Sequence, residues 1–289
     1  MWHSWSGAEE RKMSSEAEQD LIRAARSGDD GALEELLERH QSQVYRFGMK
    51  MCRDPEDAKD VLQDTLLAIA RGVGDFRGES SISTWLYAVA RSFCLKKRRR
   101  SKFAPRSVQS LDTDAGAEAM GLADPTESPA DALEGKRIEE ALEEAIGALE
   151  PHYREVLVLR DVEGLSAKEV SQVLGIGIEA VKSRLHRARL AVRARLAPLL
   201  GVSPDGAAEA PGTCPDVLMF FSRHLEDEID ADLCTEMERH LEGCGRCRGA
   251  CESLQRTLRL CRSSSSPSIP EPVKRSVRAA VRKFLAERR

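Results

Sequence analysis

The chain has few aromatic residues and no long apolar run, either internally or near its amino terminus. Aromatic residues make up 4% of the 289 residues and charged residues 32%, which favours helix-rich domains with modest cores. No segment approaches the roughly 18 apolar residues of a membrane-spanning helix, and the opening MWHSWSGAEERK lacks the apolar stretch of a secretory signal. We therefore expect a cytoplasmic protein, in which clustered cysteines indicate metal or redox chemistry.

The net charge of −4 hides a segregation of charge along the chain. Residues 91–102, RSFCLKKRRRSK, include seven basic and no acidic side chains, and residues 178–196 include six Lys or Arg against one Glu. Residues 104–135, in contrast, carry seven acidic side chains and Arg106 as their one basic residue. A single basic run usually indicates a solvated surface. Two runs in an acidic chain predict local contacts with a polyanion such as nucleic acid.

Apolar residues recur at helical spacing through most of the chain, which predicts an all-α fold. Segments rich in Pro, Gly, Ala and Ser interrupt this pattern and indicate linkers. The predicted divisions are a helical unit at 18–102, an acidic flexible linker at 103–135, a second helical unit at 136–200, a linker at 201–213, a cysteine-rich unit at 214–261, and a Ser/Pro linker with a basic amphipathic tail helix at 262–289. The apolar stripe of this tail helix comprises Val273, Val277, Val281, Phe284 and Leu285.

Residues 166–196 predict a helix-turn-helix. Ser166 and Glu169 have the spacing of a capping box, and Gly175-Ile176-Gly177 indicates a tight turn before a second helix. One narrow arc of that helix is apolar and holds Val181, Leu185, Ala188, Val192 and Leu196. The opposite side is polar and holds Glu179, Lys182, Ser183, His186 and Arg187, with Arg184 at its flank. Such a helix can place Lys182 or Arg187 at guanine or phosphate and Glu179 at cytosine. A plain helical hairpin with a basic face is the alternative.

Two stretches within this unit, YREVLVLRDVEGLSAKEV and VKSRLHRAR, resemble region 4 of extracytoplasmic-function (ECF) sigma factors. The resemblance implies that the second helix recognises the −35 element of a promoter. In the first unit, DPEDAKDVLQDTLLAIA resembles the region 2 helix that binds the clamp helices of RNA polymerase. The residues that carry this resemblance are Asp57, Asp60, Gln63 and Asp64.

The following stretch, FRGESSISTWLYAVARSFCLKKRRR, resembles the part of region 2 that opens the −10 element. That task needs aromatic or polar groups beside an unpaired base and cations along the strand. The aromatic candidates for this contact are Phe76, Trp85 and Tyr87, and the cationic ones are Arg91, Lys96, Lys97, Arg98, Arg99 and Arg100. The alternative for Trp85 and Phe93 is a place in the core.

The segment 238–251, ERHLEGCGRCRGAC, has the spacing of a metal site. Cys244 and Cys247 supply two thiolates on a glycine-flanked knuckle, and His240 lies one helical turn before them. Zinc requires four such ligands, and Cys214, 26 positions before His240, is the predicted fourth. His224 and Cys234 are rival ligands. A disulfide between the two knuckle cysteines is an alternative to metal binding.

The pattern Cys-x25-His-x3-Cys-x2-Cys, together with VLMFFSRHLEDEID, resembles the zinc-finger domain of zinc-binding anti-sigma factors. The resemblance implies helices at about 216–229 and 231–242 and after 247, pinned by zinc. Cys234, Cys251 and Cys261 exceed what one zinc site needs, and they are alternate ligands, redox partners or packing residues.

The sequence therefore predicts a non-enzymatic ECF-type sigma factor that binds core RNA polymerase and promoter DNA. Because an anti-sigma-like domain lies on the same chain, we expect a zinc-dependent self-regulation that responds to metal or oxidation. The tail helix is predicted to dock onto the sigma regions, with a membrane surface or a free tail as alternatives. Two other functions stay open: a helix-turn-helix regulator that acts without core polymerase, and a thiol redox or metal-sensing protein.

Overall fold

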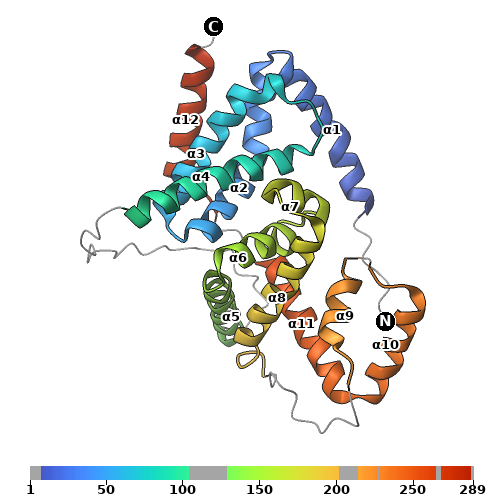
Figure 1. Ribbon diagram of the computed structural model, residues 1–289. Helices are drawn as coiled ribbons and strands as arrows, with labels where there is room; N and C mark the ends of the chain where they lie inside the picture. Colours follow the sequence, from blue (N-terminus) through green and yellow to red (C-terminus); the bar gives the residue numbers. More distant parts are fainter. Residues whose placement is uncertain (1–7, 104–128, 202–213, 227, 265–267, 288–289) are drawn as a thin grey trace. The chain divides into compact units, whose positions relative to one another are not determined.

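The computed structural model describes residues 8–103, 129–201, 214–226, 228–264 and 268–287 (Figure 1). Within these ranges every regular element is a helix, which confirms the all-α prediction. Most of the predicted acidic linker, and the second linker from residue 202, lie outside the described residues. The chain divides into two compact units, one of residues up to 97, 172–175 and from 265 onward, the other of residues 98–171 and 176–264.

The first unit combines the amino-terminal helices with the carboxyl-terminal one. Its elements are α1 (Ala8–Arg26), α2 (Asp30–Cys52), α3 (Pro55–Gly72), the 3₁₀ turn η1 (Val73–Asp75), the start of α4 (Ile82–Phe103), and α12 (Glu271–Glu287). Helices α2 and α3 cross closely, because a Cβ added at Gly48 would lie 3.3 Å from the backbone of Ala58. The buried core of α3, centred on Leu62 and Leu66, faces this crossing.

The start of α3 follows the local sequence signals. Arg53 takes a left-handed conformation (φ 62°) that ends α2, and the Asp54 carboxylate then accepts a hydrogen bond from the Asp57 backbone N–H at 2.8 Å. Pro55 occupies the first helical position, where its missing N–H costs nothing. This capping points the acidic first turn of α3 toward solvent, where Glu56 and Asp60 are exposed.

The second unit holds the other helices. Its elements are α5 (Pro129–Gly147), α6 (Pro151–Leu157), the π-helical turn η2 (Val158–Val162), most of α7 (Ala167–Leu174), α8 (Ile178–Leu196), α9 (Val217–His224), α10 (Ala231–Gly243) and α11 (Gly245–Ser263). Helix α8 packs against α5, α6, α9 and α11 (Figure 1).

The predicted helix-turn-helix is present as α7 and α8. Ser166 and Glu169 form the expected capping box, with the Ser166 N–H donating to the Glu169 carboxylate at 2.9 Å and the Glu169 N–H donating to Ser166 Oγ at 3.2 Å. Gly175 has φ 67° in the turn, a conformation that disfavours a side chain. The predicted apolar arc of α8 is confirmed, because all five of its residues are 0% exposed: Val181, Leu185, Ala188, Val192 and Leu196.

The carboxyl-terminal helices surround a small core of their own. The core contains Val217 and Phe221 from α9, Met237 and Leu241 from α10, and Leu254 and Leu258 from α11. Helix α9 is shorter than the expected span to residue 229, since it ends at His224. The chain turns there because the backbone N–H groups of Glu226 and Glu228 both donate to the Arg223 carbonyl.

Substitution of the α8 core should cost much more stability than substitution of an exposed leucine in the same unit. We expect Leu185→Ala to lower the free energy of unfolding by about 2–5 kcal/mol, because it leaves a cavity at a fully buried position. Leu199→Ala, at a position 47% exposed, should cost less than about 1 kcal/mol. Denaturant unfolding monitored by circular dichroism measures both, and equal losses would contradict the packing of α8.

Candidate functional site

The polar side of α8, predicted to contact DNA, is partly covered. Ser183, Arg187 and Glu179 are exposed, and Arg184 is half-buried. Lys182 and His186 differ from the expectation of an open face: Lys182 is half-buried, and His186 is only 9% exposed. The residues that cover them come from α9 and the turn that follows it.

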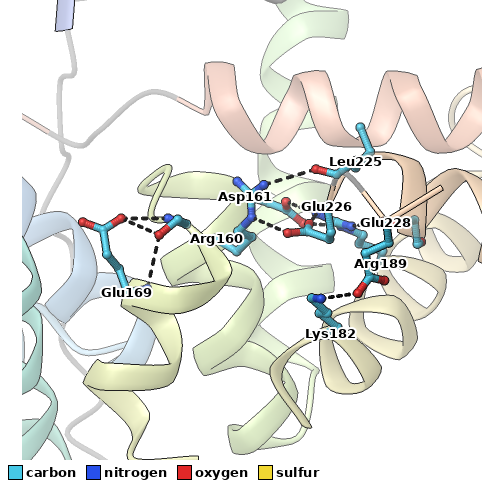
Figure 2. Close-up of polar contacts among 10 residues, drawn as sticks. Arg160, Asp161, Glu169, Lys182, Arg189, Leu225, Glu226 and Glu228 are labelled. Carbon is cyan, nitrogen blue, oxygen red and sulfur yellow. Dashed lines mark hydrogen bonds and ion pairs between the residues drawn. The ribbon is translucent and has the colours of Figure 1, made fainter. Parts of the chain in front are cut away.

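Lys182 bonds to Glu228 of the cysteine-rich part of the chain (Figure 2), and His186 bonds to Ser222 of the same part. The Lys182 ammonium forms ion pairs with Glu228 and, at 3.4 Å, with Glu179 of its own helix. The hydrogen bond with Glu228 is the main reason why the pKa of Lys182 is raised. His186 Nδ1 and Ser222 Oγ share a hydrogen bond of 3.0 Å. Two of the predicted DNA contacts are therefore satisfied within the chain.

A buried ionic cluster lies beside these contacts. Arg189, 1% exposed, makes a bidentate pair with Asp161 at 2.8 and 2.7 Å, and its guanidinium also lies 2.9 Å from Glu226. Arg160 donates to the same Glu226 at 3.0 Å and to the Leu225 carbonyl at 3.3 Å (Figure 2). Burial opposes the charge of Arg189, but Asp161 and Glu226 outweigh it and raise its pKa. Glu226, which comes from the cysteine-rich part, thus pairs with both arginines, and Arg262 of α11 adds a third positive charge near Asp161.

Sequence reasoning did not single out Arg160, Asp161, Arg189, Glu226 or Glu228. Arg189 counted as one member of a basic run, although its side chain points into the protein. A signal was present nonetheless, since the acidic run LEDEID after α9 has the opposite charge to the basic VKSRLHRAR. Complementary runs of this kind indicate that two segments can face each other.

The four predicted metal-binding residues lie close together near the junction where α10 ends and α11 begins. One ligand atom from each of Cys214, His240, Cys244 and Cys247 lies within 4.8 Å of the other three. Cys214 and Cys244 have Sγ atoms 3.9 Å apart. His240 Nε2 is buried and has no hydrogen-bond partner among the described residues, a position that costs free energy unless a further group binds it. Three thiols and one unpartnered imidazole fit a tetrahedral zinc ion.

The remaining cysteines of this part lie outside the cluster. Cys234 Sγ is 3.5 Å from His224 Nδ1, so the two rival ligands pair with each other. Cys251 is 6% exposed in the core of the three helices, and burial raises the pKa of its thiol to about 11. Cys261 is 0% exposed. These placements favour packing over reactivity for Cys251 and Cys261.

The four predicted polymerase-binding residues lie along α3 of the first unit. Asp60 and Asp64 are exposed, whereas Asp57 and Gln63 are half-buried. Lys97 of α4, predicted to contact DNA, instead forms ion pairs with Asp57, at 3.2 Å, and with Asp60. The hydrogen bond to Asp60 is the main reason why the pKa of Lys97 is raised.

The aromatic candidates of region 2 differ in exposure. Trp85 is half-buried and stacks on Phe76, with ring centroids 5.1 Å apart and an interplanar angle of 20°. Tyr87 is only 2% exposed and packs at 5.4 Å against Phe47, so its burial speaks against the expected contact with a base.

The cationic candidates of α4 are more accessible, with Arg98 exposed and Arg91 half-buried. Lys96 is exposed and lies 4.8 Å from the ring centroid of Phe93, which is half-buried rather than core.

Helix α12 docks onto α2 and α3 within the first unit. Val277, Val281 and Leu285 are buried, which confirms the predicted apolar stripe. Arg278 and Arg282 pair with Glu38 and Glu34 of α2 at 2.6 and 2.7 Å. These two ion pairs are largely exposed, so the apolar stripe supplies most of the attachment. Phe284 adds a contact with Arg71, whose guanidinium lies 5.4 Å from the ring centroid.

Known protein families match three parts of this chain. The family "Sigma-70 region 2" matches residues 36–103, "Sigma-70, region 4" matches residues 139–192, and a zinc-finger family matches residues 214–248. The ECF RNA polymerase sigma factor SigM of Mycobacterium tuberculosis is 34% identical over 187 residues, which cover 65% of this chain and 86% of SigM. This chain belongs to the ECF sigma factors.

Another relative agrees with this membership. The RNA polymerase sigma-H factor of Pseudomonas aeruginosa is 29% identical over 192 residues, which cover 65% of this chain and 98% of the relative. A solved structure, CnrH in complex with the cytosolic domain of CnrY, is 27% identical with a TM-score of 0.43, covering 62% of this chain and 97% of that one. As a sigma factor, the protein directs RNA polymerase to promoters. No helix in the described ranges is both long and apolar enough to cross a membrane.

The contact of His186 with α9 should make the second unit sensitive to mild acid. Burial lowers the pKa of His186, with Arg189 and Arg187 acting in the same direction and Asp216 opposing them. The unfolded chain, with a histidine pKa of about 6.5, therefore binds the proton first as pH falls. The neutral His186 imidazole therefore makes its full contribution to the free energy of unfolding above about pH 6.5. This contribution is lost as the pH falls from there toward the lowered pKa of His186 in the folded protein.

We expect the wild type to lose more free energy of unfolding between pH 7.5 and 5.5 than His186→Gln, by up to about 1.4 kcal/mol per unit of pKa difference. Glutamine keeps a hydrogen bond to Ser222 but does not titrate. Denaturant titrations at several pH values measure the difference, and parallel pH profiles would contradict the burial of a neutral His186.

Proposed function

We propose that this ECF sigma factor covers its own promoter-reading helix with the zinc-binding part of the same chain. Released, α8 reads the −35 element with Glu179, Lys182, Ser183, Arg184, His186 and Arg187. Region 2 binds core RNA polymerase through Asp57, Asp60, Gln63 and Asp64, and α4 contacts the −10 element. The protein acts in the cytoplasm and catalyses no reaction itself, since the polymerase carries the chemistry.

The observation that carries this proposal is a pair of contacts on α8. Lys182 forms an ion pair with Glu228, and His186 shares a hydrogen bond with Ser222. A cation that pairs with a carboxylate cannot also neutralise a DNA phosphate, and phosphate contacts supply much of the affinity for DNA. Helix α9 also packs on α8. Glu226 and Glu228 thus supply negative charges beside α8, the kind of charge that DNA phosphates would supply.

Zinc is the proposed cofactor of the covering part. Its four ligands would be Cys214, His240, Cys244 and Cys247, and the unpartnered His240 Nε2 supports this set. The ion would tie the start of α9 to the junction of α10 and α11. Because the three helices share a small core, loss of this tie should loosen α9, and with it the grip on α8.

Helix α12 supports a second self-contact in the first unit. It attaches to α2 and α3 of region 2 through buried valines and two arginine–glutamate pairs. The carboxyl-terminal part of the chain thereby contacts the helices of both sigma regions. Membership of the ECF sigma factors argues against the alternative of a regulator that acts without core polymerase, and the burial of Cys251 and Cys261 argues against a general thiol redox protein.

Transcription with purified core polymerase tests the proposal. A pooled library of promoter fragments serves as template, and sequencing of the transcripts identifies the promoters used. A chain that ends at Gly201 should initiate at defined promoters, and the full chain should initiate at the same promoters several-fold less often. Equal output from both chains would overturn the self-covering, whereas no defined initiation from either would overturn the sigma assignment.

Neutralising the two glutamates should release α8 without removing any domain. We expect Glu226→Gln/Glu228→Gln to raise promoter output of the full chain several-fold, because Lys182 and Arg160 lose their carboxylate partners on the covering part. Glu236→Gln is the matched control, since Glu236 is exposed on α10 of the same part. An output no higher than that of the control would count against the ionic contact as the source of repression.

Loss of a metal ligand should release α8 by a different route. We expect His240→Ala to lower bound zinc well below one ion per chain and to raise promoter output, and we expect chelation of the wild type to raise promoter output as well. Cys234→Ser should keep both zinc and repression, because Cys234 pairs with His224 outside the cluster. Elemental analysis and transcription measure the two effects. Retention of zinc by His240→Ala, or its loss from Cys234→Ser, would refute the ligand set.

A further inference from the structure

Two cysteines outside the zinc-binding part meet within region 2. Cys52 is the last residue of α2 and Cys94 lies on α4, 42 positions later, yet their Sγ atoms are 3.5 Å apart and share a hydrogen bond. Neither is in a disulfide. Cys94 is 7% exposed, whereas Cys52 is half-buried and open to a small solute.

Charged residues surround the pair. Lys97 lies one turn after Cys94 on α4, and Asp54 and Asp57 stand at the start of α3, just after Cys52. The hydrogen bond with Cys94 lowers the pKa of Cys52 below its ordinary value, and Lys97 acts in the same direction against burial and the two carboxylates. A thiol with a lowered pKa has a larger thiolate fraction, which is the form that reacts with oxidants.

We propose that Cys52 and Cys94 are a redox-active dithiol, which a hydroperoxide oxidises to a disulfide that joins α2 to α4. The pair is independent of the zinc ligands and of the self-covering of α8. It lies where Lys97 meets Asp57 and Asp60, so the new bond would fix α4 beside the candidate polymerase-binding helix.

The chemistry balances with the peroxide as the sole oxidant. The Cys52 thiolate attacks one peroxide oxygen, the O–O bond breaks, and the other oxygen leaves with a proton as water or an alcohol. Cys94 then attacks the sulfur of the resulting sulfenic acid, the S–S bond forms, and the S–O bond breaks to release a second water. The two thiols lose two electrons and two protons in total, and the peroxide accepts both.

Peptide mapping of the full zinc-loaded chain tests the dithiol directly. The protein is treated with hydrogen peroxide, remaining thiols are alkylated, and proteolytic peptides are analysed by mass spectrometry without reduction. We expect a cross-linked species that joins the Cys52 and Cys94 peptides and is lighter than their sum by two hydrogen atoms. A thiol reductant should restore both separate peptides.

Variants and unfolding temperature separate a specific bond from general oxidation. Cys52→Ser should give no cross-link, whereas Cys261→Ser, at a buried cysteine elsewhere, should keep it. The disulfide closes a long loop, so peroxide should raise the unfolding midpoint of the first unit by roughly 5 °C in the wild type and not in Cys52→Ser. Absence of the cross-link, or oxidation of Cys52 to sulfinic acid in its place, would overturn the proposal.

Discussion

The packing of the second unit depends on the buried salt bridge between Arg189 and Asp161. Glu226 pairs with the same arginine. Arg189 projects from the back of the promoter-reading helix and is 1% exposed, so its charge must be balanced inside the protein. Asp161 balances it within region 4, and Glu226 extends the cluster to the covering part, where it also pairs with Arg160. Because Asp161 remains when Glu226 leaves, region 4 can lose its cover without leaving a buried charge unpaired.

This arrangement would make the proposed covering reversible. Salt should weaken the more exposed contact of Lys182 with Glu228, and it should also weaken the proposed binding of DNA to the same helix. In the proposed function, the covering part and DNA would therefore compete for the same cations of α8. Which of the two occupies α8 would depend on whether α9 is held in place. The cluster of four candidate ligands, near the start of α9 and the end of α10, lies where a bound metal could hold α9.

Local signals in the sequence predicted the helices well, whereas contacts between distant segments were harder to predict. The capping box of Ser166 and the five-residue apolar arc of α8 depend on residues a few positions apart, and both are present. The metal cluster was predictable because cysteine spacing constrains it. Tyr87 and His186 were expected to face DNA, but their burial depends on Phe47 and on Ser222, which no local pattern identifies. Glu226 was missed because its partners Arg189 and Arg160 lie 37 and 66 positions away, although the opposite charges of LEDEID and VKSRLHRAR were visible in the sequence.

Hydrogen–deuterium exchange of α8 tests the central claim most directly. Peptides from residues 178–196 are compared between the zinc-loaded full chain and a chain that ends at Gly201, with peptides from α3 as an internal reference. We expect slower exchange of the α8 peptides in the full chain and equal exchange of the reference peptides in both. Equal exchange of α8 in the two chains would contradict the covering of the promoter-reading helix by the carboxyl-terminal part.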